Sequence, residues 1–155
     1  MIIRKTRPGD LGLVAAVHAR SIAESCSGHY TPAQIRAWTG VLQPAVYESA
    51  IKDKHFIVAC DGDAILGLGI LDLGHPEINA VYVDPDRAGQ GVGGRILSEL
   101  EETAEKHGFT QLTVFSTLNA RHFYLKHGYR THKPATHSLP GGLELECIEM
   151  HKRLG

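Results

Sequence analysis

Apolar residues recur along the chain at two spacings, and each spacing predicts a type of secondary structure. Short apolar runs and alternating apolar positions are typical of strands, whereas apolar residues three and four positions apart are typical of amphipathic helices. Strands are expected at residues 2–6, 56–60, 65–71, 78–83 and 112–115, from 129 onward and at 143–150. Helices are expected at residues 11–22, after a cap at Thr31, between 92 and 108, and at 120–126.

The order of these elements predicts a mixed α/β fold. Antiparallel strands followed by a crossover helix and another strand favour an α+β or α/β arrangement, with one central mixed β-sheet and helices packed on its faces. A chain of 155 residues is expected to form one domain, residues 1–155. A surface loop is expected at residues 134–142. A change in the apolar phase between Cys147 and Ile148 suggests a bulge in the final strand.

Residues 81–95 run from an apolar strand through a glycine-rich loop into an amphipathic helix. Glycine lets the backbone approach an anion closely, and the first N–H groups of the following helix have no partner within that helix. The positive end of the helix dipole lies at the same place. This stretch therefore predicts a binding site for a phosphorylated cofactor.

Two other phosphate-binding motifs fit the chain less well. Gly89, Gly91 and Gly94 have the G-x-G-x-x-G spacing of dinucleotide-binding proteins. That motif requires an acidic residue about 20 positions further on, and residues 112–116 contain none. A nucleotide-binding oxidoreductase would need that acid. A Walker-type loop would need a Gly-Lys-Ser/Thr sequence, which is missing, so kinases and ATPases are excluded.

Charge and cysteine content restrict the partners and the compartment. The chain has 16 basic and 17 acidic residues, a formal charge of −1, so neither nucleic acid nor an anionic membrane is an expected partner. Its three cysteines, Cys26, Cys60 and Cys147, lie far apart and predict buried reduced thiols in a cytoplasmic protein. The late strands offer an edge that a second copy of the chain could cover in a homodimer.

Two motifs together resemble the GNAT N-acetyltransferase superfamily. The first is Val83-Asp84-Pro85 followed by residues 88–93, Ala-Gly-Gln-Gly-Val-Gly, which is similar to the V-x-P strand end and Q/R-x-x-G-x-G/A loop of that family. The second is residues 119–129, similar to its N-A-x-x-F-Y-x-K-x-G-F/Y segment. The resemblance implies a GNAT-like fold and acetyl-coenzyme A as the cofactor. It covers most of the chain and is weakest at residues 23–50, where the family builds its substrate pocket.

The resemblance also assigns the cofactor-binding residues. Ala88 stands where the family usually has Arg or Gln, so Arg87 or Arg95 is expected to meet the phosphates instead. The cofactor arm is expected to lie as an extra strand between residues 77–83 and 112–115, with a free N–H near Val83 holding the carbonyl oxygen. The residues expected to contact the cofactor are Val81, Val83, Arg87, Ala88, Gly89, Gln90, Gly91, Val92, Gly93, Gly94 and Asn119.

Acetyl transfer to an amine needs a base for the amine and a proton for the leaving thiolate. The resemblance implies that Tyr124 is the general acid and that Glu77 is the general base, directly or through a water; His75 is the second choice. Direct transfer is expected without an acyl-enzyme, because Cys60, the cysteine nearest to these residues in the sequence, has no activating partner nearby. The alternative is a catalytically silent module that senses acyl-coenzyme A.

Aromatic and histidine residues raise two further questions. Tyr30 and Trp38 flank the cap at Thr31 and could line a pocket for the acceptor, which is a small-molecule or protein amine. Histidines recur at positions 122, 127, 132 and 137. A five-residue step turns about 500° around a helix, which scatters the rings over different faces. No metal site is therefore expected from this series.

Overall fold

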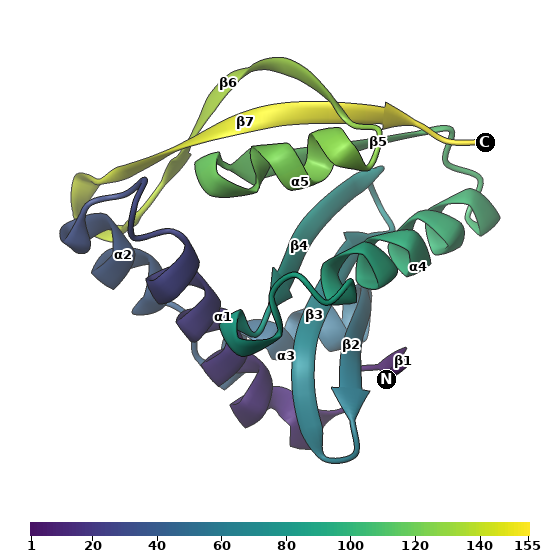
Figure 1. Ribbon diagram of the computed structural model, residues 1–155, viewed down its shortest axis with the longest axis horizontal. Coiled ribbons are helices and arrows are strands. Elements are labelled where there is room, and N and C mark those ends of the chain that lie inside the picture. The colour runs from purple at the N-terminus through teal and green to yellow at the C-terminus, as the bar shows by residue number, and fades with distance from the viewer.

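A mixed β-sheet of seven strands runs through the molecule, and the computed structural model describes residues 1–155 (Figure 1). The strands lie in the order β1-β2-β3-β4-β5-β7-β6. β4 and β5 are parallel, and all other neighbours are antiparallel. The strands are β1 (Ile2–Lys5), β2 (His55–Asp61), β3 (Ala64–Asp72), β4 (Glu77–Val83), β5 (Gln111–Thr117), β6 (Arg130–Ser138) and β7 (Glu144–Arg153).

Helices cover both faces of this sheet, as the sequence predicts. Leu11 of α1 and Tyr47 of α3 are buried in one apolar cluster with residues of β2, β3 and β4. Ile96 of α4 and Tyr124 of α5 are buried in a second cluster on the opposite face. The helices are α1 (Leu11–Ser25), α2 (Pro32–Thr39), α3 (Pro44–Asp53), α4 (Val92–Lys106) and α5 (Arg121–Lys126). The predicted mixed α/β fold is therefore confirmed.

Two glycines of β3 allow α4 to lie directly against the sheet. A Cβ atom at Gly69 would be 2.5 Å from Cγ2 of Ile96, and one at Gly67 would be 2.9 Å from Cδ1 of the same side chain. Ile96 and Leu100 are fully buried at this contact. The close approach fixes the start of α4, and with it the glycine-rich loop, against the ends of β3 and β4.

β4 and β5 separate soon after they meet. Their parallel pairing is limited to Glu77 with Thr113 and Ile78 with Val114. The register between β3 and β4 shifts just after this point, so that Asn79 is an additional residue in β4. Such bulges bend and twist the strand that carries them. The remaining residues of β4 therefore diverge from β5, as the ribbons in Figure 1 show, and the space between the two strands is called the notch.

One helix was missed by the sequence pattern. α3 was not expected because only Tyr47 and Ala50 of its residues are buried, which gives too few apolar positions to define a helical period. Pro44 begins this helix, where the absent N–H costs nothing because the first N–H groups of a helix have no partner. By contrast, the capping box of α2 formed by Thr31 and Gln34 is present as expected.

The predictions for the last strands need two corrections. The loop expected at residues 134–142 is wrong in its first half, because β6 continues through Pro134 to Ser138. β6 is an edge strand, where proline is tolerated because a missing N–H breaks no ladder on the open side. The irregularity lies in β6 rather than in the final strand, since the register against β7 skips His132. One edge of β6 is open, and the prediction that a second copy of the chain covers it is not tested by the structure.

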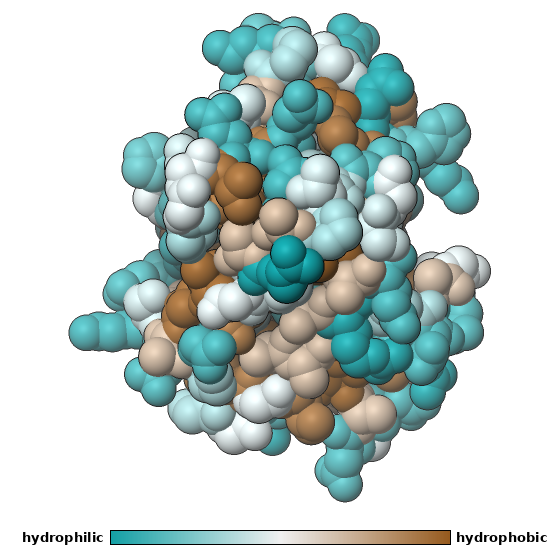
Figure 2. Space-filling view, turned by 90° about the vertical axis from the view of Figure 1, so that its left-hand side faces the viewer, coloured by the Kyte–Doolittle hydropathy of each residue, from teal (hydrophilic) through white to brown (hydrophobic).

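Apolar side chains are also found on the outer surface. Leu13, Val41 and Val46 are exposed. Figure 2 shows apolar residues on one face of the molecule, gathered mostly in its lower half and mixed with hydrophilic ones. All three cysteines are unpaired and buried, as expected. None of the helices combines the length and the apolar composition that crossing a membrane requires.

Candidate functional site

Two cavities meet beside the notch between β4 and β5. The loop cavity, of about 510 Å³, includes most of the glycine-rich loop, and the aromatic cavity, of about 410 Å³, includes Tyr30 and Trp38. The residues that line both are Asn79, Tyr82, Phe115 and Thr117. Because all four belong to β4 and β5, a molecule in one cavity can reach a molecule in the other through the notch.

The glycine-rich loop presents main-chain N–H groups to the loop cavity. Gly89 and Gly91 have positive φ angles of 77° and 81°, which side chains disfavour. No N–H of residues 89–94 donates a hydrogen bond to another main-chain atom, and the first bond into α4 runs from the N–H of Arg95 to the carbonyl of Gly91. Unpaired N–H groups at a helix N-terminus are suited to a phosphate. The residues present therefore fit the diphosphate of a phosphorylated cofactor.

The other two glycines of the loop allow α4 and α5 to approach each other. A Cβ atom at Gly93 would lie 3.1 Å from Cε1 of Phe123, and one at Gly94 would lie 3.0 Å from Nε2 of His127. Phe123 and His127 themselves line the loop cavity. Nδ1 of His127 lies 2.8 Å from the carbonyl oxygen of Phe123, so this nitrogen carries the proton. Any side chain at either glycine would displace the wall of the cavity.

Arg87 is the arginine that faces the loop cavity. It lines the cavity together with Ala88, whereas Arg95 and Gln90 do not. Arg87 has no ion pair within the protein, so its guanidinium is available to an anion. Lys126 of α5 also lines the cavity; it is the lysine of the motif at residues 119–129, but no cofactor contact was expected of it. Of the loop residues expected to contact the cofactor, only Gln90 lies outside the cavity.

Val81 and Val83 lie where the sequence analysis places the cofactor arm. Both line the loop cavity, and both follow Ile78, the last residue of β4 that pairs with β5. On their other side they pair with Gly69 and Gly67 of β3. The main chain of β4 is therefore open towards β5, and an extended polar group can pair with it as an added strand does.

Tyr124 of α5 lies in the wall of the loop cavity. Its side chain is buried, and its hydroxyl makes no hydrogen bond within the protein, unlike the hydroxyl of Tyr129, which donates to Glu101. Burial raises the pKa of Tyr124 well above its usual value. The hydroxyl is thus protonated at neutral pH and free to donate to a group bound in the cavity.

Asn119 also lines the loop cavity, where its Oδ1 atom accepts a hydrogen bond from Sγ of Cys26 at 3.2 Å. Cys60 is the cysteine nearest to these residues in the sequence, but it does not border the loop cavity. Cys26 borders the loop cavity, whereas Cys60 is buried in the apolar cluster under α1. Burial raises the pKa of Cys26 to about 11, so it is a thiol at neutral pH and a weak nucleophile.

Glu77 lies on the aromatic-cavity side of the notch. Its Oε2 atom accepts a hydrogen bond from Nδ2 of Asn79 at 2.9 Å, and Oδ1 of Asn79 accepts one from Nζ of Lys54 at 2.6 Å. These two hydrogen bonds, from Lys54 to Asn79 and from Asn79 to Glu77, orient the carboxylate. His75, the second choice for the base, lines neither cavity and has a side chain that is 81% exposed. The geometry therefore favours Glu77 over His75.

Tyr30 and Trp38 line the aromatic cavity with their rings in an edge contact, 5.8 Å between centroids. The Tyr30 hydroxyl donates to the carbonyl of Glu146 at 2.6 Å and accepts from the N–H of Leu118 at 3.0 Å. Tyr30 thus ties the start of α2 to the ends of β5 and β7, besides forming a wall. Phe115 contributes a further aromatic wall and is 44% exposed.

Some residues of the two cavities could not be recognised in the sequence. His18 on α1 belongs to neither motif, and Cys26 lies in the segment with the weakest resemblance, residues 23–50. Asn79 could have been noticed, because it lies two positions after Glu77 and alternate residues of a strand share a face. The contribution of Lys54 depends on β2 and β4 lying in one sheet, which no local pattern reveals.

Comparison with known proteins agrees with the resemblance to GNAT acetyltransferases that the two sequence motifs indicate. The family model of the acetyltransferase (GNAT) domain matches residues 26–139. An uncharacterised N-acetyltransferase of Escherichia coli, YafP, is 26% identical over 84% of this chain and 82% of its own length. A crystal structure of a GCN5-related N-acetyltransferase from Rhodopseudomonas palustris is 28% identical, with a TM-score of 0.92 over 99% of this chain and 95% of that one.

A second solved structure shares the fold at lower identity. The PaiA N-acetyltransferase of Thermoplasma acidophilum, solved in complex with coenzyme A, has a TM-score of 0.84 and 20% identity over 98% of both chains. The family match, the seven-stranded sheet and the glycine-rich loop agree with the two motifs. The chain belongs to the GNAT family of acetyltransferases, enzymes whose acyl donor is acetyl-coenzyme A.

Proposed function

We propose that this enzyme transfers the acetyl group of acetyl-coenzyme A to a primary amine of a small molecule or a protein, by direct attack in a ternary complex. The observation that carries the proposal is the junction of the two cavities, with Tyr124 on the loop side and Glu77 on the aromatic side. An acid and a base on opposite sides of one notch are what acyl transfer to an amine requires.

The loop cavity holds and orients the donor. The N–H groups of residues 89–94 bind the diphosphate together with Arg87, and the open main chain at Val81 and Val83 aligns the arm. Asn119, which lines the same cavity, would help to orient the arm. When bound, the cofactor supplies the thioester that is the acetyl donor. An N–H of β4 near Val83 holds the carbonyl oxygen, where negative charge develops in the transition state.

Glu77 and Tyr124 move the two protons of the reaction. Glu77, held by Asn79, removes a proton from the incoming ammonium, directly or through a water, so that the amine has a free lone pair. Tyr124 donates its hydroxyl proton to the leaving sulfur, and the second proton that the attacking nitrogen loses on becoming an amide would restore the tyrosine hydroxyl through water. Cys26 remains a thiol because burial raises its pKa, which favours direct transfer over an acyl-enzyme.

The aromatic cavity is proposed to bind the acceptor. Tyr30, Trp38 and Phe115 give it aromatic walls, and Glu77 places a carboxylate on one side. Aromatic rings and a carboxylate attract a cationic amine that carries an apolar or planar group. Tyr30 and Trp38 are accordingly proposed as acceptor-binding residues. The reaction is placed in the cytoplasm, where the three buried thiols stay reduced.

A thiol-release assay over a panel of amines tests this function. The panel would contain polyamines, aromatic amines, amino acids and peptides with a free N-terminus, each with acetyl-coenzyme A. The expected result is amine-dependent release of coenzyme A together with an acetylated product seen by mass spectrometry. Binding of coenzyme A, seen as a higher Tm, with no release for any amine would instead support the sensor module.

A further inference from the structure

His132, Glu149 and His151 form a cluster that lines neither cavity of the proposed active site, although Glu149 pairs with Phe115 at the notch. Glu149 and His151 belong to β7, and His132 belongs to the edge strand β6. One candidate ligand atom from each residue lies within 4.8 Å of those of the other two. We propose that these three residues bind a divalent transition-metal ion, with Zn²⁺ as the representative ion. This inference does not depend on the proposed transferase function.

The bulge in β6 brings the three side chains together. Arg130 pairs with His151 and Thr131 with Met150, but the next residue in register with Glu149 is Lys133. His132 is the extra residue. The side chain of His132 therefore lies close to both Glu149 and His151, which are alternate residues of β7 and point to the same face of the sheet. His151 is outside the series of histidines at five-residue steps, so only the pairing of β6 with β7 shows the cluster.

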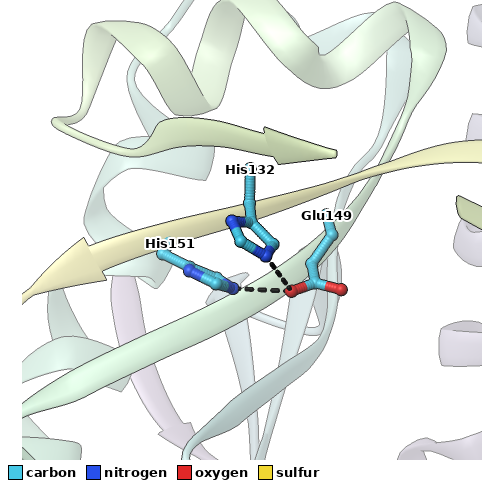
Figure 3. Close-up of side chains that lie close together, drawn as sticks. All are labelled: His132, Glu149 and His151. Carbon is cyan, nitrogen blue, oxygen red and sulfur yellow. Dashed lines mark hydrogen bonds and ion pairs between the residues drawn. The ribbon is translucent and has the colours of Figure 1, made fainter. Parts of the chain in front are cut away.

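The geometry of the cluster suits a metal ion after a small adjustment. Oε2 of Glu149 lies 2.7 Å from Nε2 of His151 and 3.8 Å from Nε2 of His132. The two imidazole rings are stacked, with 4.5 Å between centroids and an interplanar angle of 24°. Figure 3 shows both Nε2 atoms directed at the same carboxylate oxygen. Two imidazoles and one carboxylate are a ligand set used by zinc, with a further position open.

Access and charge define what kind of site this is. His132 is 51% exposed, whereas the Glu149 and His151 side chains are 17% and 28% exposed, so an ion can enter from solvent and meet two ordered ligands. A polar cavity of about 580 Å³ borders the two histidines and contains Arg130 and Arg153. Their positive charge opposes a cation, so we expect a dissociation constant on the order of micromolar, with water or an anion in the open position.

A bound ion would also act on the fold of this region. β6 is an edge strand whose only partner is β7, and its pairing is interrupted at the bulge. An ion held by His132 on one side and by Glu149 and His151 on the other would link the two strands at that weak point. Because such an ion binds the native state only, it should raise the Tm, and above the Kd the increase should follow the logarithm of the ion concentration.

Isothermal titration calorimetry with ZnCl₂ tests the proposal on the full chain, without an affinity tag and after removal of metals by a chelator. His132→Gln and Glu149→Gln are the test variants. His29→Gln, at an exposed histidine outside the cluster, is the matched control. We expect one zinc site in the unaltered protein, at least about tenfold weaker binding in both test variants, and no change in the control.

Co²⁺ provides a second readout, because a site with three protein ligands gives a visible absorption band that both test variants should lose. The metal-free Tm of His132→Gln checks that the fold is retained, and retention is expected since this side chain is half exposed on an edge strand. Equal zinc affinity in His132→Gln and in the unaltered protein would overturn the proposal. Equal weakening in His29→Gln would do the same, since it would indicate scattered surface binding.

Discussion

Nδ1 of His18 lies 2.7 Å from the hydroxyl of Tyr47, deep between α1 and α3, while Nε2 of the same ring is buried without a partner. Tyr82 covers the ring at a centroid distance of 4.1 Å. Burial lowers the pKa of His18 from 6.5 to about 4 and raises that of Tyr47 to about 12. His18 is therefore a neutral imidazole at the inner wall of the aromatic cavity.

This histidine should make the protein less stable in mild acid. Between pH 6.5 and about 4 the unfolded chain binds a proton at His18 that the folded chain does not, so stability falls as the pH falls through this range. The full effect is about 3 kcal/mol by the usual conversion. His18→Asn should flatten this part of the profile of Tm against pH. The same substitution at the exposed His122 is the control, and a profile left as steep in His18→Asn would contradict the assignment.

Tyr124→Phe should lower kcat by about 10²-fold or more, because it removes the proton donor for the thiolate. Binding of coenzyme A should change little, since the hydroxyl makes no hydrogen bond in the free protein and the ring remains in the wall. Steady-state kinetics and the coenzyme A-induced shift in Tm measure the two effects separately. The role of Tyr124 as the acid would be ruled out by a kcat equal to that of the unaltered enzyme.

Glu77→Gln should also lower kcat/KM, and the loss should shrink as the pH rises. At high pH a larger part of the acceptor is already the free amine, so a base on the enzyme matters less. The pH profile of kcat/KM for the variant and the unaltered enzyme provides the comparison. His75→Gln is the matched control because His75 lies outside both cavities. A loss that is the same at every pH would argue for a structural role of Glu77.

Gly91→Ala should weaken the binding of coenzyme A. Gly91 has a φ of 81°, where an alanine costs about 1–2 kcal/mol, and relief of that strain would reorient the N–H groups that face the cavity. Gly62→Ala introduces a similar strain at a φ of 59° in the β2–β3 turn. Both variants should lower the Tm, but only Gly91→Ala should raise the Kd measured by calorimetry. A Kd for coenzyme A that is the same in Gly91→Ala as in the unaltered protein would show that the loop does not hold the cofactor.

Gly69→Ala and Gly12→Ala should change stability in opposite directions. At Gly69 the new methyl group would lie 2.5 Å from Cγ2 of Ile96, and overpacking of this kind costs about 1–3 kcal/mol. At Gly12 in α1 nothing lies within 4 Å of the new atom, and alanine favours the helix by up to about 1 kcal/mol. Urea unfolding of both variants measures the difference. A neutral result for Gly69→Ala would mean that α4 can move away from the sheet at little cost.

Local chemistry in the sequence determined most of the elements and the family of this protein, but not α3 or the extent of β6. The glycine-rich loop of residues 89–94, the capping box of Thr31 and Gln34, and the apolar stripe of α4 each depend on residues close together in the chain, so they could be recognised without the fold. The role of Tyr124 followed from the motif at residues 119–129, and that of Glu77 from the family resemblance. They remain predictions until the kinetics above are measured.

Features of the site that depend on residues far apart in the chain were decided only by the tertiary structure. The notch exists because a bulge at Asn79 bends β4 away from β5, and the orientation of Glu77 depends on Lys54, which lies between α3 and β2. The burial of His18 and the meeting of His132 with His151 likewise arise from strand register and helix packing. Periodicity records which face of an element is apolar, but it holds no information about which elements will be neighbours, because pairing is set by the packing of the whole chain.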